Sequence, residues 1–375
     1  MSWSSIIGQE RIKTQLKQTL QNHRIAHAYL FYGPEGIGKD ALAIEFAKAM
    51  NCETGSIEAC GTCKNCRRMD TFQYPNTKLV FALPSGKSEK TGDDPITVLT
   101  EAQVADVREQ IQWKAKDPYH RIEVPKANFI KINSVRDIKR EASMSRTEEG
   151  KKIFVILNAD MMNAEASNSL LKTLEEPLPG IILLLTTSVK DQLLPTIISR
   201  CQLLQCDSLQ DAEIEGALIS REGVDHSIAR LAAQLSQGSY GNARRLSSLN
   251  MLDERKDVVE FLRLVLGKNR ATLIDAIDEL ASSSDRPGIE RWLKLLQSWL
   301  RDALLLQQNA QTPLLDDEKK SMESFVTKFN HANLIASIQT VEKAIAHLDK
   351  NVYLHLILTT LAIDLRKFIT EAPSV

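Results

Sequence analysis

The sequence predicts an α/β domain built on a parallel sheet, followed by a region that is helical throughout. Apolar runs at 28–32, 153–157, 181–187 and 201–206 read as strands, and segments of helical periodicity lie between them. Alternation of this kind is typical of a parallel sheet that helices cover on both faces. Beyond residue 207, apolar residues recur at helical spacing.

Length and composition bound the class of protein. A chain of 375 residues is long enough for two or three domains. We expect the α/β domain over 1–207, a small helical bundle over 208–250 and longer amphipathic helices over 251–375. With 43% apolar and 25% charged residues, the composition is that of a globular protein. The formal net charge of −1 provides no general basic field for nucleic acid, so any such contact must come from a local patch.

No apolar run approaches the roughly 20 residues that a membrane-spanning helix needs. The longest are Ile181–Thr187 and Leu354–Ile363. The N-terminus is polar and lacks the layout of a signal peptide. We therefore expect a cytoplasmic protein whose six cysteines are free thiols or metal ligands, without a membrane partner.

A phosphate-binding loop is expected after the first strand. Residues 33–39 match GxxxxGK, with Gly33, Gly36 and Gly38 allowing backbone N–H groups to surround phosphate and Lys39 reaching the outer phosphates. Asp40 stands where Ser or Thr would ligate magnesium, and its carboxylate adds repulsion. The motif predicts a nucleotide site at which binding of ATP and Mg²⁺ is in question. A glycine-rich turn without a ligand is the alternative.

Four cysteines form a compact group after this loop, spaced C-x7-C-x2-C-x2-C. They are Cys52, Cys60, Cys63 and Cys66. This spacing places sulfurs on tight turns, where four thiolates complete a tetrahedron around Zn²⁺ and leave no open position, so the ion would be structural. Unligated thiols are the alternative. Cys201 and Cys206 lie in an apolar stretch and read as inert strand residues.

A candidate nucleic-acid contact lies at Ser134. Ser134 and Asp137 match the S-x-x-D capping box, which predicts a helix from Ser134 to about Ser143. Arg136 and Lys139 fall in its first turns, where free N–H groups and cations could hold a nucleic-acid phosphate. A capped, solvated helix without a ligand is equally compatible with the pattern.

Two other regions carry no chemical motif. The polar stretch 84–127 reads as an insertion with one helix over 101–112, and the sequence gives no function for it. Apolar stripes run along 287–308 and 351–369 at helical spacing. Such stripes are usually intramolecular core, and an exposed face in an oligomer is the alternative.

Four features together resemble one known family. They are the phosphate loop, the cysteine group inserted after it, Ser169–Pro177 (SLLKTLEEP) and Ser199-Arg200-Cys201. The combination resembles the delta-prime family of subunits in the clamp loader of bacterial DNA polymerase III, which are AAA+ proteins. The resemblance covers residues 1–250 and the helix at 351–369, with 84–127 outside it. It implies a helical lid at 208–250 and a collar at 251–375 that assembles subunits into a ring.

Departures from the AAA+ motor pattern imply that this chain does not hydrolyse ATP. Leu157 and Asn158 stand where a motor has the Asp that holds magnesium and the Glu that activates water. Gly241 replaces the arginine of the second sensor, and Asp40 is the altered metal position. Thr187 matches the first sensor. Because phosphoryl transfer depends on positioning and charge compensation, these losses should remove it.

The retained Arg200 implies a role for a neighbouring subunit. In the family, this arginine projects into the neighbour's ATP site, which would make Arg200 catalytic in trans. The implied partners are the gamma/tau motor subunits and the delta subunit of a hetero-oligomeric ring, the sliding clamp, and primed DNA through the assembled complex.

Three other functions remain open at this stage. An active clamp-loader ATPase of the gamma/tau type would require Asp160 to take the metal. A DNA-binding AAA+ scaffold module would rely on the Ser134 helix and the cysteine group. A degenerate AAA+ scaffold could also belong to another complex, with Arg200 paired within its own fold.

Overall fold

A computed structural model describes residues 2–86, 90, 92–143, 150–177, 180–249, 251–283, 285–308, 316–350 and 352–371. It divides into two compact units. The first unit is Met1–Ala217 with Gln237–Asn242, and the second is Leu218–Ser236 with Ala243–Val375. The three-domain division expected from the sequence stays a prediction. Among the described residues, no helix combines the length and apolar character needed to cross a membrane.

The first unit contains a parallel sheet of five strands, which confirms the predicted α/β class. The strands are β1 (Ala28–Tyr32), β2 (Thr77–Val80), β3 (Lys152–Ile156), β4 (Ile181–Thr187) and β5 (Gln202–Gln205). Their order is β2-β3-β4-β1-β5, and each adjacent pair is parallel. Tyr32 lies opposite Thr187, so the segment after β1 begins beside the carboxyl end of β4.

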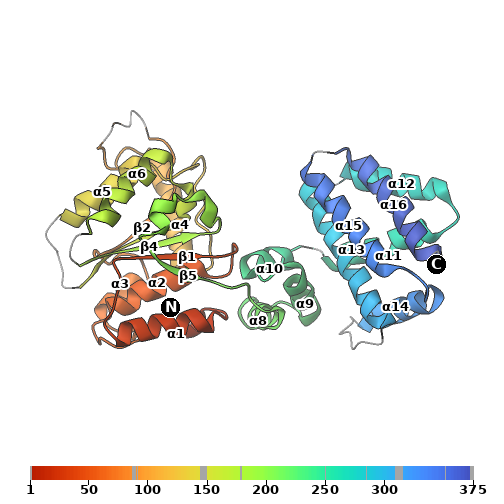
Figure 1. The fold of residues 1–375 in the computed structure, drawn as a ribbon, viewed down its shortest axis with the longest axis horizontal. Coiled ribbons are helices and arrows are strands. Elements are labelled where there is room, and N and C mark those ends of the chain that lie inside the picture. Colours follow the sequence, from red (N-terminus) through yellow and green to blue (C-terminus); the bar gives the residue numbers. More distant parts are fainter. Residues whose placement is uncertain are drawn as a thin grey trace. The chain divides into compact units, whose positions relative to one another are not determined.

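Helices cover both faces of this sheet (Figure 1). On one face lie α1 (Glu10–Gln21), α2 (Lys39–Met50), α3 (Lys64–Met69) and part of α4 (Glu101–Lys116); on the other lie α5 (Ile132–Ser143), α6 (Ala164–Glu175) and α7 (Pro195–Ile198). Because side chains alternate along a strand, Tyr29 and Phe31 join the first core while Ala28 and Leu30 join the second. The unit ends with α8 (Asp211–Ala217).

The insertion at 84–127 contributes to the first core. Its helix α4 begins with a capping box, in which Thr100 Oγ1 accepts from the backbone N–H of Gln103 and the Gln103 side chain bonds back to Thr100. Leu99, Val107 and Val124 are buried in the core beside α2. The helix expected over 101–112 is present and ends one turn later, at Lys116.

The expected capping box at Ser134 is not formed, which corrects the sequence interpretation. Helix α5 begins at Ile132, and Ser134 lies inside it on the buried face. Within the part of the chain that the structure describes, the Ser134 hydroxyl has no hydrogen-bond partner, and Asp137 instead pairs with Lys78 of β2 at 2.5 Å. Packing of Val135 and Ile138 into the core sets the rotation of the helix, and that rotation turns Ser134 inward.

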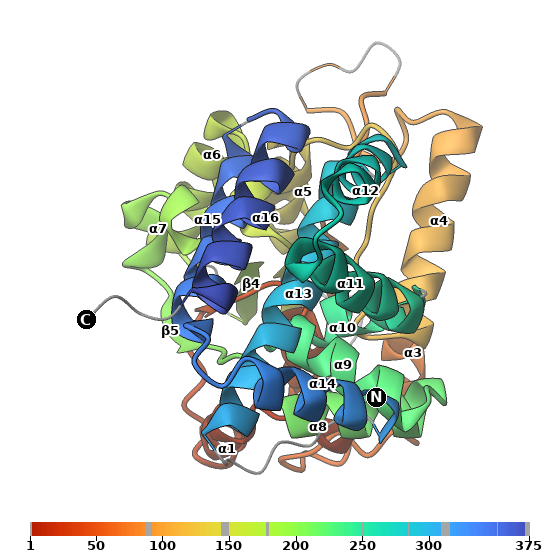
Figure 2. The ribbon, with the colours of Figure 1, turned by 90° about the vertical axis from the view of Figure 1, so that its right-hand side faces the viewer.

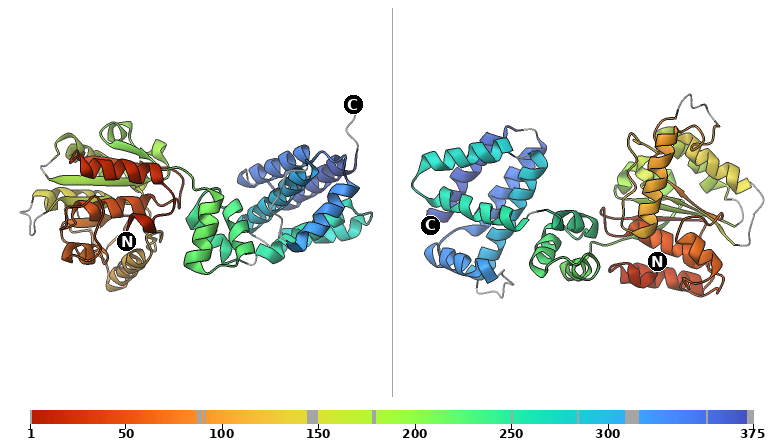
Figure 3. Two further views of the ribbon diagram at one scale, coloured as in Figure 1. Left: turned by 90° about the horizontal axis from the view of Figure 1, so that it is seen from below. Right: turned by 180° about the vertical axis from the view of Figure 1, so that it is seen from behind.

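The described part of the second unit is helical (Figure 3). Its helices are the π-helical turn Leu218–Glu222, α9 (His226–Leu235), α10 (Tyr240–Ser247, whose first residues belong to the first unit), α11 (Met251–Leu266), α12 (Arg270–Ser283), α13 (Arg286–Gln307), α14 (Asp316–Lys328), α15 (Leu334–Asp349) and α16 (Leu354–Thr370). Helix α13 packs against α11, α14 and α15, and α16 packs against α15 (Figure 2). Trp292 and Trp299 are buried, as the predicted stripe requires.

A buried ion pair joins two helices of the second unit. Arg255 of α11 is 3% exposed, and its guanidinium donates to Asp302 of α13 at 2.8 Å. Removal of one member of such a pair weakens the electrostatic stabilisation of the charge that stays buried, which costs more than the pair itself contributes.

We predict that Asp302→Ala lowers the free energy of unfolding of the second unit by about 3–5 kcal/mol. The control is Glu260→Ala, which removes a pair with Arg263 whose two side chains are exposed and should cost at most about 1 kcal/mol. Scanning calorimetry of the full chain measures both variants. Equal effects would show that Asp302 does not compensate a buried charge.

Candidate functional site

The phosphate loop joins β1 to α2, as the motif predicts. Gly33, Gly36 and Gly38 have φ values of 149°, 73° and 99°, which side chains rarely adopt. A Cβ atom on Gly33 would lie 2.2 Å from the carbonyl oxygen of Cys206, and one on Gly36 would lie 2.4 Å from Ser239 Oγ. The chain therefore needs glycine at both positions for its own packing.

The ammonium group of Lys39 bonds to the loop itself. Its Nζ donates to the carbonyl oxygens of Gly33, at 2.9 Å, and Pro34, and to Ser188 Oγ at 3.1 Å. The side chain is buried, and this burial lowers the pKa of Lys39. Lys39 therefore stabilises the loop by bonding to backbone carbonyl oxygens of the loop itself.

The carboxylate of Asp40 is neutralised from a distant part of the chain. Its Oδ1 accepts from Thr186 Oγ1 at 2.8 Å, and its Oδ2 accepts from Lys114 Nζ at 2.9 Å. Burial raises the pKa of Asp40, but the ammonium of Lys114, the hydroxyl of Thr186 and the charge of Lys39 together outweigh it and hold the pKa below its ordinary value. Lys114 belongs to α4 and is 1% exposed. Sequence reasoning missed Lys114, because a lysine in a polar insertion gives no sign of its partner.

The ends of β3 and β4 hold the other groups of the pocket. Leu157 is buried in the core, so it presents no ligand atom to the loop. The backbone N–H of Asn158 donates to Thr186 Oγ1 at 3.1 Å. Thr187 Oγ1 donates to Asp160 Oδ1 at 2.5 Å. The polar groups that approach the loop therefore bond to one another.

Gly241 lies against the loop through its backbone. Its N–H donates to the carbonyl oxygen of Gly36 at 3.1 Å. A Cβ atom on Gly241 would lie 3.2 Å from the α carbon of Gly36. Any larger side chain here would press on the phosphate loop.

Arg200 follows α7 and lies at the surface of the first unit. Its guanidinium donates to the carbonyl oxygen of Thr196 at 2.9 Å and pairs with Glu175 of α6 at 3.0 Å. The Arg200 and Glu175 side chains are 35% and 49% exposed. Among the described contacts of Arg200, none reaches the phosphate loop of its own chain.

The three residues expected to contact nucleic acid do not share one surface. Ser134 is buried, whereas Arg136 and Lys139 are exposed on α5. Arg140, the next cation, bonds to Asp94 at 3.1 Å and to Asp137. Of the three expected residues, Arg136 and Lys139 are therefore accessible and Ser134 is not.

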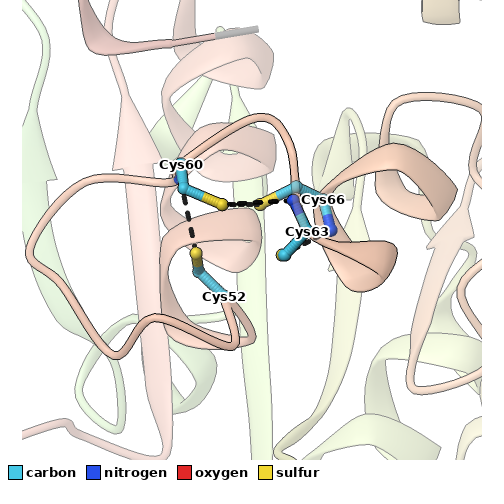
Figure 4. A group of neighbouring side chains, drawn as sticks. All are labelled: Cys52, Cys60, Cys63 and Cys66. Carbon is cyan, nitrogen blue, oxygen red and sulfur yellow. Dashed lines mark hydrogen bonds between the residues drawn. The ribbon is translucent and has the colours of Figure 1, made fainter.

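The four clustered cysteines come together as their spacing predicts (Figure 4). Their sulfur atoms all lie within 4.8 Å of one another. A tetrahedron with metal–sulfur bonds of about 2.3 Å has sulfurs about 3.8 Å apart, and the Cys60 and Cys66 sulfurs are 3.9 Å apart. The sequence places Cys52 after α2 and the other three around the start of α3. The arrangement fits a four-coordinate metal ion.

Backbone N–H groups support the sulfurs in this cluster. The N–H groups of Cys60, Cys63 and Cys66 each donate to the sulfur of the preceding cysteine of the group at 3.3 Å. The bond from Cys63 is the main cause that lowers the pKa of Cys60 to about 5. By contrast, burial raises the pKa of Cys201 and Cys206 to about 12, so both are inert thiols.

The strand order and the loop between β1 and α2 define the class of the first unit, which is that of AAA+ nucleotide-binding domains. A family model described as "DNA polymerase III, delta subunit" matches residues 8–210, and "DNA polymerase III, delta subunit, C terminal" matches 249–367. Because the first match spans more than half of the chain, the protein belongs to the DNA polymerase III delta subunit family.

Similar proteins agree with this assignment. The DNA polymerase III subunit delta' of Bacillus subtilis is 29% identical over 356 residues, covering 94% of both chains. The delta' subunit of Pseudomonas aeruginosa is 28% identical and covers 83% of this chain and 82% of its own length. The subunit tau of Escherichia coli is 28% identical over 66% of this chain, which is 32% of tau. The resemblance predicted from the motifs is confirmed, and it supports a clamp-loader role in DNA replication.

We predict that the full chain binds one divalent metal ion and that Cys66→Ala loses it. Four thiolates fill the coordination sphere of the ion. With three, one coordination position is open to water and chelators, so the ion is lost more readily. Elemental analysis after dialysis measures the metal content per chain. Cys201→Ala is the matched control, because Cys201 is a buried cysteine outside the cluster, and it should retain the metal. Loss of metal from both variants, or from neither, would contradict the assignment.

Proposed function

We propose that this chain is a delta-prime subunit of the DNA polymerase III clamp loader that does not itself hydrolyse ATP. It stands in a hetero-oligomeric ring with gamma/tau motor subunits and a delta subunit in the cytoplasm. It supplies Arg200 to a neighbouring ATP site and helps to load the sliding clamp on primed DNA. Family membership and similarity to delta' proteins over nearly their whole length support this proposal.

One observation carries the proposal: the acidic groups of the pocket are held within the chain, while Arg200 lies at the surface. Asp40 is bound to Lys114 and Thr186, and Asp160 is bound to Thr187. Hydrolysis would need a carboxylate to position magnesium and a second group to orient water. The residues that could retain phosphate are Gly33, Gly36, Gly38 and Lys39, with Asp40 and Thr187 as vestigial members of the site.

Arg200 is suited to act in trans because its present contacts are weak. An ion pair between two partly exposed side chains contributes about 0–1 kcal/mol. An arginine finger in a neighbouring site lowers the barrier to phosphoryl transfer by about 4–7 kcal/mol, which is 10³–10⁵ in rate. Loss of the pair with Glu175 therefore costs little compared with the gain in rate at the neighbour's site.

The metal in the cysteine cluster is assigned here as structural Zn²⁺. Four thiolates in a tetrahedral arrangement are the ligand set that zinc prefers, and they leave no position for water or substrate. The ion would link the end of α2 to α3 and stabilise that part of the first unit.

The similarity to tau keeps one alternative in view, namely an active ATPase. It would require Asp160 to leave Thr187 and hold magnesium in the chain's own pocket. Brisk ATP hydrolysis by the isolated chain would favour that alternative.

We predict that Arg200→Ala reduces the DNA- and clamp-stimulated ATPase of a reconstituted complex. Only one of several motor sites loses its arginine finger, and the rate of hydrolysis at that site should drop about 10³-fold or more. The total rate should therefore fall by the fraction that this site contributes. The measurement is steady-state ATP hydrolysis by the complex of this chain with the gamma/tau and delta subunits of its own organism.

Two variants control this experiment. Arg24→Ala removes an exposed arginine elsewhere on the first unit and should leave the rate unchanged. Glu175→Gln removes the partner of Arg200 and should preserve or raise the rate. An Arg200→Ala complex with the wild-type rate at each motor site would refute the trans role.

We also predict a modest contribution of α5 to DNA binding by the assembled complex. Replacement of both Arg136 and Lys139 by alanine should weaken binding of primed DNA and reduce the slope of log K against log salt by up to about 2. The control is Arg140→Ala, since that guanidinium is already bound to Asp94 and Asp137. Identical salt slopes for all three proteins would exclude a phosphate contact by α5.

A further inference from the structure

Tyr119 of the insertion lies against the phosphate loop. Its side chain is 9% exposed. A Cβ atom on Gly38 would lie 3.0 Å from the Tyr119 hydroxyl oxygen and 3.1 Å from Cε1 of its ring. Gly38 is the residue that precedes α2, at the helix end where N–H groups of this motif meet phosphate. The tyrosine therefore packs against the helix end at which this motif binds phosphate.

The tyrosine is fixed at both of its ends. The Tyr119 hydroxyl accepts from the backbone N–H of Ile7 at 2.7 Å, in a buried bond. The ring packs edge-on against Tyr240 with centroids 4.9 Å apart. Tyr119 thus bridges the segment before α1, the loop and the start of α10 within the first unit.

The same insertion supplies charges to the loop. Lys114 neutralises Asp40, and its ammonium also donates to the carbonyl oxygen of His120 at 2.7 Å. On the other side of the loop, Arg121 pairs with Glu35. The two acidic side chains of the loop region are therefore each matched by a cation from residues 114–121.

The segment that carries these groups is itself well ordered. Asp117 Oδ1 accepts from the backbone N–H of Tyr119 at 2.9 Å, and the N–H of His120 donates to the carbonyl oxygen of Asp117 at 3.0 Å. The His120 ring bonds to Gln110 Oε1 of α4 at 2.9 Å. The turn is thus held against α4 before it reaches the loop.

We propose that residues 114–121 form an internal plug that fills the phosphate-loop site and excludes nucleotide. This inference rests on the proposed function, since a subunit that lends Arg200 needs no nucleotide of its own. It assigns a role to the insertion at 84–127. The plug supplies the counter-charge and the buried hydrogen bond that keep the loop folded without a bound phosphate.

The test separates the contribution of Tyr119 from that of Asp40 and its ion pair with Lys114. Asp40→Thr with Lys114→Met restores a hydroxyl after Lys39 and removes both members of the ion pair, so no buried charge is left alone. The second variant adds Tyr119→Ala. Binding of a fluorescent ATP analogue with Mg²⁺ is titrated for the full chain. We expect no saturable binding by wild type or the double variant up to about 1 mM, and at least about tenfold tighter binding by the triple variant.

Tyr353→Ala in place of Tyr119→Ala is the matched control, because Tyr353 is exposed, and it should bind no better than the double variant. Equal affinity of the double and triple variants would overturn the plug, and so would failure of the triple variant to bind. Binding of the analogue by the wild-type chain would overturn it as well.

Hydrogen exchange provides a second measurement that needs no nucleotide. Tyr119→Phe keeps the ring and removes the acceptor of the Ile7 N–H, so exchange of that amide should accelerate at least tenfold. Unchanged protection of Ile7 would contradict the bridging contact. Suppose that the wild-type chain binds nucleotide and that Arg200→Ala still lowers the ATPase rate of the reconstituted complex. The plug proposal is then wrong, and the proposed function stands.

Discussion

The contact between Asp40 and Lys114 is the constraint on which the pocket depends. The carboxylate of Asp40, at the start of α2, is mostly withdrawn from water, and removal of a charge from water costs free energy that a partner must offset. Lys114 provides that compensation from α4 at 2.9 Å. This contact joins the insertion to the phosphate loop. The position of α4 and the geometry of the pocket therefore depend on each other.

This constraint explains why a loop of the phosphate-binding type persists in a pocket whose acids are engaged internally. Gly33 and Gly36 are required by contacts with Cys206 and Ser239, whatever the loop binds. Lys39 bonds to loop carbonyls, and Thr187 bonds to Asp160. The side chains of Lys39, Asp40 and Thr187 thus each have a partner inside the first unit, and the loop motif does not by itself indicate catalysis.

The sequence predicted what depends on local pattern and missed what depends on distant contacts. Four of the five strands, the cysteine spacing and the stripe of α13 follow from patterns among neighbouring residues, and the structure confirms them. The sequence did not predict β2 (Thr77–Val80). Ser134 was misread because core packing, which no capping pattern encodes, rotates α5. Lys114 is 74 residues from Asp40, and Tyr119 is 112 residues from Ile7. Neither contact can be predicted from the sequence of the insertion, because each forms only when the chain is folded.

The exposure of a charged side chain in the first unit determines how strongly it depends on a partner within the chain. Where a charge is buried, as at Lys114, only a matched partner in the same chain makes the fold stable, so both members of that pair are unavailable to others. Where a charge is half-exposed, as at Arg200, water already stabilises it and the pair with Glu175 contributes about 1 kcal/mol or less. In the ring that we propose, a phosphate in the neighbouring site replaces Glu175 as the partner of this guanidinium. A subunit that satisfies its own pocket and leaves one arginine weakly held can therefore act through its neighbour.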